Sequence, residues 1–160
     1  MRKALLAIFL FFSFNLYGAG AKIDIPKYDW SWKGFFGTYD RASAQRGLKV
    51  YREVCAGCHS MNYLSYRNLV DLGFSEDHIK AIAAEHLVLD GPNDEGEMFE
   101  RDGIPSDQFV NPYLNEKAAR AANNGAYPPD LSLIVKARPK GADYIKALLL
   151  GYVDPPEDIK

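Results

Sequence analysis

The chain has 160 residues, a length typical of a single domain. Its composition is that of a globular protein, with 48% apolar and 25% charged residues. The formal net charge of −2 argues against a nucleic-acid-binding protein, because phosphate binding depends on clustered lysine and arginine.

The first residues have the pattern of an export signal. Arg2 and Lys3 form a short basic start, residues 4–12 are all apolar, and small residues follow at 18–21. Nine residues in a helix extend about 14 Å, which is half of a bilayer's hydrocarbon core. We therefore predict a cleavable signal peptide over residues 1–20 rather than a retained anchor. Its removal takes two of the 19 basic side chains, so that 17 basic oppose 21 acidic ones and the net charge becomes −4.

Two elements are predicted before the first cysteine. Residues 23–39 are rich in glycine and aromatic side chains and predict an irregular arm that packs onto the domain. Asp40 is a candidate N-cap for a helix over residues 41–54. Leu48, Tyr51 and Val54 recur at three-residue steps in that helix, which predicts one buried stripe.

The only two cysteines lie in the run Cys55-Ala56-Gly57-Cys58-His59, at the C-terminal end of the predicted helix. A redox-active pair normally precedes a helix N-terminus, where the dipole lowers a thiol pKa, and a zinc site needs further ligands at short spacing. Cys-x-x-Cys-His is the pattern of c-type haem attachment. Two thiols on one turn can each add to a porphyrin vinyl group, and the next imidazole then reaches the iron. Covalent haem is the favoured interpretation, with disulfide chemistry and zinc as alternatives.

The next segments predict two short elements and a long loop. Residues 63–72 predict a short helix or turn, and residues 75–87 a helix with Ser75 as N-cap and Ile79 and Ile82 on one face. Residues 90–112 contain seven acidic side chains against the single Arg101, with three glycines and three prolines. They predict an acidic surface loop, which is either a solvated excursion or a docking surface for a basic partner.

The last part of the chain predicts two further helices. Residues 115–122 are rich in alanine and end at Asn123-Asn124-Gly125, a typical C-cap. Residues 127–130 predict an extended turn, residues 131–135 form an apolar run, and residues 141–150 predict the final helix.

Taken together, several segments resemble the cytochrome c1 family, the haem subunits of the ubiquinol:cytochrome c reductase (cytochrome bc1) complex. The likeness extends from about Asp29 to Pro156. Its segments are Asp29-Trp30-Ser31, Phe36-Gly37-Thr38-Tyr39-Asp40-Arg41, Gln45-Arg46-Gly47 through Val50-Tyr51, Glu53-Val54-Cys55 to Ser60-Met61-Asn62, Ser65-Tyr66-Arg67-Asn68-Leu69, Ala118 to Ser132, Asp143-Tyr144, Gly151-Tyr152 and Pro155-Pro156.

The resemblance implies a mostly α fold: a cytochrome c-like helical domain with long irregular loops over residues 21–160, after the signal peptide. One covalent haem c would be anchored by Cys55 and Cys58 and ligated by His59. The pocket would be lined by Asn123, Pro128, Pro129 and Tyr144, with Arg138 facing a haem propionate.

The resemblance also implies a role and a location. The chain would accept electrons from a Rieske iron–sulfur protein, work beside cytochrome b, and pass electrons to a cytochrome c. It would do so at the periplasmic side of a bacterial inner membrane, with no bond-making chemistry of its own.

In one respect the sequence departs from the family pattern. The family's distal methionine and C-terminal membrane anchor lie beyond the Asp-Pro-Pro segment, and the sequence ends at Lys160 before either. Met61 is too close to His59 to reach the other face of the ring, and Met98 lies in the acidic loop. We therefore expect a C-terminally incomplete haem domain, an iron without a distal thioether and a lowered reduction potential. Two alternatives to electron transfer follow: a truncated gene product, or an open-site haem protein such as a ligand sensor or peroxidase-like protein.

Overall fold

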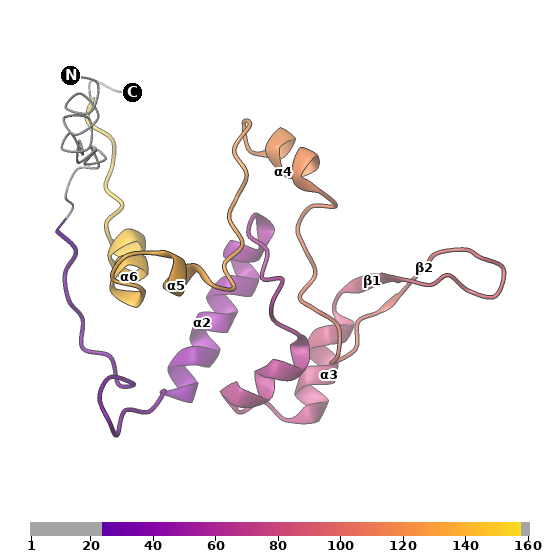
Figure 1. Cartoon of the computed structure of the whole chain (residues 1–160), viewed down its shortest axis with the longest axis horizontal. Coiled ribbons are helices and arrows are strands. Elements are labelled where there is room, and N and C mark those ends of the chain that lie inside the picture. The colour runs from indigo at the N-terminus through magenta and orange to yellow at the C-terminus, as the bar shows by residue number, and fades with distance from the viewer. Residues whose placement is uncertain (1–23, 158–160) are drawn as a thin grey trace, which may run out of the picture.

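The computed structural model describes residues 24–157, so the predicted signal peptide lies outside the described residues. Helices predominate in this range, which confirms the predicted mostly α fold class, and none of them has the length and apolar character needed to cross a membrane. The elements in chain order are α2 (Arg41–Glu53), η1 (Cys55–Gly57), η2 (Tyr66–Leu72), α3 (Glu76–Ala84), β1 (Leu87–Asp90), β2 (Phe99–Asp102), α4 (Glu116–Ala122), α5 (Ile134–Ala137) and α6 (Ala142–Leu150). Figure 1 shows the irregular segments that connect them.

Helix α2 begins where the sequence predicts. The Asp40 carboxylate accepts a hydrogen bond from the Ser43 amide (3.2 Å), which confirms the N-cap. Tyr51 is buried and Leu48 packs beside it, but the predicted third member of the stripe, Val54, is 71% exposed. The reason is local: the helix ends at Glu53, and Val54 leaves helical geometry (φ −124°, ψ −58°).

The core forms where α2, η2 and α3 meet. Its buried side chains come from these three elements and from one residue after the hairpin: Tyr51, Tyr66, Leu69, Ile79, Ile82, Ala83 and Phe109. The Tyr66 and Phe109 rings stack with centroids 4.7 Å apart. Helix α3 carries the predicted buried pair Ile79 and Ile82, and its Ser75 cap is confirmed by a 3.3 Å bond from the His78 amide to the Ser75 hydroxyl.

The segment predicted as a long acidic loop contains a β-hairpin instead. Strands β1 and β2 pair antiparallel, from Leu87 opposite Asp102 to Asp90 opposite Phe99. The Arg101 guanidinium crosses the base of the hairpin and pairs with Asp90 and with Asp107. This pairing stabilises the hairpin, whose second strand is charged at three of its four positions and shows no apolar alternation. The hairpin projects away from the helices (Figure 1), and the acidic side chains at 94, 95 and 97 are exposed in its turn.

The N-terminal arm is irregular, as predicted, and is held against α6. Asp143 accepts hydrogen bonds from the Trp30 indole N–H (2.6 Å) and the Tyr28 amide (3.2 Å). The Lys146 ammonium lies 4.2 Å from the centre of the Tyr28 ring, a cation–π contact. These contacts fasten residues from the two ends of the domain to each other.

Candidate haem-attachment site

The predicted attachment motif lies directly after the C-terminal end of α2. There the chain tightens into the 3₁₀ turn η1, and the Cys55 carbonyl accepts from the amides of Cys58 (3.1 Å) and His59 (2.8 Å). This turn brings both thiols and the imidazole onto one short stretch of backbone. The sequence places the motif at the C-terminal end of a helix, whereas a redox-active pair precedes a helix N-terminus, and the structure confirms this placement.

Both thiols are free, with Cys58 exposed and Cys55 half-buried against the core. The two cysteines do not form a disulfide in this structure. Within residues 24–157 no three metal-binding side chains gather, so the zinc alternative has no support there either. Next to the thiols, a Cβ added at Gly57 would meet open space, so packing within the chain does not require the glycine.

His59 is oriented by a residue far along the chain. Its Nδ1 atom lies 2.8 Å from the carbonyl oxygen of Pro129. Because a carbonyl oxygen can only accept, Nδ1 carries a proton, and in the neutral ring Nε2 then keeps the lone pair. That is the tautomer that an iron ligand needs. The partner is Pro129, one of the residues that the family resemblance places in the haem pocket.

The segment after the motif is joined to residues 129–132 by further hydrogen bonds. The Asp130 carboxylate accepts from the Ser60 hydroxyl (2.9 Å) and the Asn62 amide (2.8 Å). The Ser132 hydroxyl accepts from the Tyr63 amide (3.0 Å), and the Ser60 carbonyl accepts from the Leu131 amide (2.9 Å). In Figure 1 this second segment descends from α4 beside the C-terminal end of α2.

The local charges support this arrangement. Partial burial raises the pKa of Asp130, but the hydrogen bonds from Asn62, Ser132 and Ser60 outweigh it and lower that pKa below its ordinary value. Burial, helped by the Asp130 charge, raises the pKa of Tyr51 to about 12. The Tyr51 phenol therefore stays protonated and donates to the His59 carbonyl (3.1 Å).

The other predicted pocket residues lie in three different surroundings. Pro128 and Cys58 line one small cavity of about 90 Å³ together with Tyr113, whose hydroxyl accepts a 3.1 Å bond from Asn123. Tyr144 lines a different cavity of about 570 Å³, between the N-terminal arm and α6. Arg138 is exposed and donates only to the Ala137 carbonyl (3.5 Å) among the residues of the described range.

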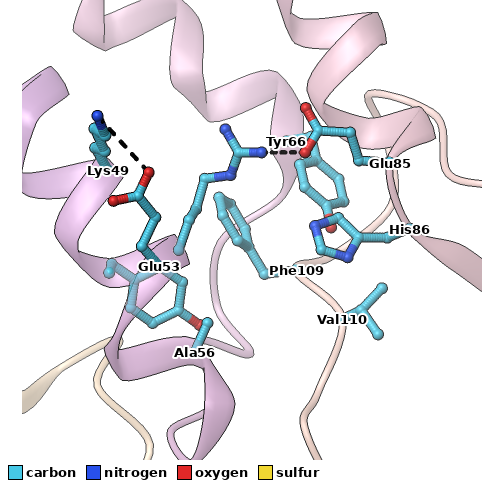
Figure 2. Close-up of a pocket in the computed structure, with 10 residues that line it drawn as sticks. Lys49, Glu53, Ala56, Tyr66, Glu85, His86, Phe109 and Val110 are labelled. Atoms are coloured by element: carbon cyan, nitrogen blue, oxygen red, sulfur yellow. Dashed lines mark hydrogen bonds and ion pairs between the residues drawn. The ribbon is translucent and has the colours of Figure 1, made fainter.

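A further cavity of about 390 Å³ contains none of the predicted site residues. Figure 2 shows its wall of aromatic rings, with Tyr66 and His86 side by side and Phe109 next to them. The charged side chains around it are paired, Arg52 with Glu85 and Lys49 with Glu53. Its lining combines core residues with Ala56, the residue that follows Cys55 in the attachment motif.

Sequence reasoning missed the residues that connect the two segments. Asp130 and Ser132 belong to the segment Ala118 to Ser132 that resembles the family, but the sequence assigns them no role. The sequence predicts Tyr51 only as a core residue. An aspartate after a Pro-Pro pair is typical of a turn that bonds the backbone two residues on, as Asp130 does with the Ser132 amide (2.8 Å). Its partners at Ser60 and Asn62 are non-local, and no local signal indicates them.

The residues present fit a covalent haem c. Two free thiols stand on one turn, the adjacent imidazole has its ring proton engaged and its other nitrogen free, and a residue without a side chain lies between the thiols. This donor set is the one that haem attachment and axial ligation require.

Comparison with known proteins also indicates a haem protein of the cytochrome c1 type. A model described as Cytochrome C1 family matches residues 30–160. "Cytochrome c1 1, heme protein, mitochondrial" of Arabidopsis thaliana is 58% identical over 137 residues, which cover 86% of this chain and 45% of that protein. Cytochrome c1 of Rhodospirillum rubrum is 56% identical over 130 residues, covering 81% and 48%.

A third relative is the "Cytochrome b-c1 complex catalytic subunit, mitochondrial" of Candida albicans, 54% identical over 131 residues that cover 82% of this chain and 46% of that protein. The chain thus spans about half the length of the curated relatives it matches. With a family match over most of its length and a motif whose geometry suits haem attachment, the chain belongs to the cytochrome c1 family.

Proposed function

We propose that this chain is the haem-carrying electron-transfer part of a cytochrome bc1 complex. The observation that carries the proposal is the His59 ring, fixed by the Pro129 carbonyl beside two free thiols. When bound, the haem supplies a one-electron iron couple. Family membership favours this function over a ligand sensor or a peroxidase-like protein.

The chain's own residues would hold and orient the group. Cys55 and Cys58 provide the thioether anchors, and His59 presents Nε2 as the axial ligand. The Pro129 carbonyl keeps the ring proton on Nδ1 and fixes the orientation of the ligand ring. Pro128 lies beside Cys58 and would face the ring from that side.

The remaining pocket residues are proposed from the family resemblance. Asn123 supports the same small cavity through Tyr113. Tyr144 is proposed from the resemblance alone, since it lines the separate cavity between the N-terminal arm and α6. The Arg138 guanidinium pairs with none of the described carboxylates, which leaves it available to a haem propionate.

The partners are proposed on the same grounds. Electrons would arrive from a Rieske iron–sulfur protein, beside cytochrome b, and leave to a cytochrome c. The exposed acidic turn of the hairpin suits a basic partner. The location would be the periplasmic side of a bacterial inner membrane, after cleavage of residues 1–20 from a haem domain over 21–160. N-terminal sequencing of the exported protein should read from Ala21.

Rapid mixing of the oxidised, haem-loaded chain with a reduced Rieske protein tests the function. The proposal predicts a reduction rate that rises with the concentration of the Rieske protein. A haem-loaded chain that stays oxidised, while chemical reductants reduce it fully, would exclude the proposed electron transfer.

A further inference from the structure

Asp130 uses both carboxylate oxygens, and only one of them serves its own turn. Oδ1 accepts the Ser132 amide two residues on (2.8 Å), which is a local turn bond. Oδ2 accepts both the Ser60 hydroxyl and the Asn62 amide, 70 and 68 residues away. The second oxygen therefore joins two remote segments directly after the attachment motif.

We propose that Asp130 is the positioning residue that holds the His59 ring in its ligand geometry. This inference rests on the proposed function, because it concerns the axial ligand of the same site. Asp130 directly follows Pro129, whose carbonyl accepts the hydrogen bond from His59 Nδ1, and Ser60 directly follows His59. The hydrogen bond between Asp130 and Ser60 therefore fixes the separation of Pro129 and His59, the residues that precede them.

Three further contacts make the junction rigid. Ser132 accepts the Tyr63 amide and Ser60 accepts the Leu131 amide, so two hydrogen bonds flank those of Asp130. From the α2 side, Tyr51 donates to the His59 carbonyl. Pro129 adds stiffness of its own, because the proline ring fixes φ and limits where its carbonyl can point.

The charge on Asp130 has to be separated from its geometric role. Replacing Asp130 removes a negative charge close to His59, which by itself alters the exchange of the ring proton. A double variant, Ser60→Ala with Ser132→Ala, removes two of the connecting hydrogen bonds and leaves the net charge unchanged. Asp107→Asn is a matched control, because Asp107 accepts bonds from Arg101 and Ile104 at the base of the hairpin.

The experiment uses the full chain with covalent haem and ¹⁵N-labelled histidine. The chain has three histidines, and substitution of His78 and His86 identifies their signals. The readout is the lifetime of the His59 Nδ1 proton against exchange with solvent. Asp130→Ala should shorten this lifetime by about tenfold, because it removes the bonds that hold the Pro129 carbonyl against the ring; loss of an outer partner costs ligand-histidine sites about tenfold or more in affinity. The double serine variant should shorten it by about threefold, since each lost bond is a modest net contribution.

Asp107→Asn should leave the lifetime unchanged while lowering overall stability. An unchanged lifetime in Asp130→Ala overturns the inference, and so does an equal shortening in Asp107→Asn. If Asp130→Ala fails to mature, the double serine variant decides by the same comparison.

The mass of the wild-type protein separates this inference from the proposed function. A chain without covalent haem defeats the proposed function. The junction is then decided by amide exchange at Asn62 and Tyr63 in the haem-free chain. Protection that is lost in Asp130→Ala supports the junction, and amides already unprotected in the wild type overturn it.

Discussion

The Nδ1 atom of His59 donates to the carbonyl oxygen of Pro129 over 2.8 Å, across 70 residues of sequence. This single bond decides which ring nitrogen is free, since the carbonyl can accept but not donate. It also explains why the Pro-Pro segment and the cysteine motif belong to one site although they are far apart in the chain.

His59→Ala should remove the axial ligand while both thioether anchors remain. The expected result is a haem-loaded protein whose absorption bands are displaced and are restored by added imidazole. His78→Ala is the control, since His78 is exposed on α3 and should leave the spectrum unchanged. Identical spectra for His59→Ala and the wild type would contradict the ligand assignment.

Tyr51→Phe should lower the free energy of unfolding by about 1 kcal/mol, because it removes the hydrogen bond to the His59 carbonyl without creating a cavity. Tyr63→Phe should change it by less than about 0.5 kcal/mol, since the Tyr63 side chain is 73% exposed. Urea unfolding of both variants gives the comparison. Equal losses in the two would mean that the Tyr51 hydroxyl contributes nothing specific.

Two glycines should respond to alanine in opposite directions. A Cβ at Gly103 would lie 2.5 Å from the Ala83 carbonyl oxygen, so Gly103→Ala forces the hairpin away from α3. The expected loss is about 2 kcal/mol in the free energy of unfolding. A Cβ at Gly47 meets open space on α2, and Gly47→Ala should stabilise the helix by about 0.5–1 kcal/mol. Thermal unfolding of the pair distinguishes these signs, and stabilisation by Gly103→Ala would show that the close approach is absent.

Acid should destabilise the hairpin base. The hydrogen bond from Arg101 is the largest of the effects that lower the pKa of Asp107 below its ordinary value of 3.8. A carboxylate with a lowered folded-state pKa stabilises the fold fully above its unfolded pKa, and this contribution is lost as the pH falls through the folded value. The free energy of unfolding should therefore decline below about pH 4.

Asp107→Asn tests that decline. The variant should be less stable than the wild type at neutral pH and should lose less on acidification, because the titrating group is gone. Unfolding curves between neutral and acid pH measure both effects. Parallel declines in the two proteins would assign the acid sensitivity to other carboxylates.

Elements with local signals were predictable from the sequence. Asp40 and Ser75 mark the starts of α2 and α3. Each is the last non-helical residue before its helix, and its side-chain oxygen accepts a hydrogen bond from an amide of the first turn. The hairpin was not predictable, since it depends on Arg101 reaching Asp90 and Asp107 and its strands carry charge on both faces. The prediction that Val54 is buried is wrong because the three-residue apolar spacing continues in the sequence past Glu53, where the helix ends.

The candidate site divides in the same way. Cys55, Cys58 and His59 lie within five residues of sequence, and their spacing alone indicates covalent haem attachment. The hydrogen bonds that Asp130 accepts from Ser60 and Asn62 join segments about seventy residues apart in the sequence. Nothing in the periodicity or composition of either segment indicates that pairing, so only the folded structure reveals it.

Mass spectrometry of the exported protein, denatured and extracted with acid–acetone, tests whether haem is covalently attached at Cys55 and Cys58. The mass of one haem should stay with the wild-type chain and be lost from Cys55→Ser/Cys58→Ser. A wild-type chain that carries no haem mass after expression with a c-type maturation system would show that this protein is not a c-type cytochrome.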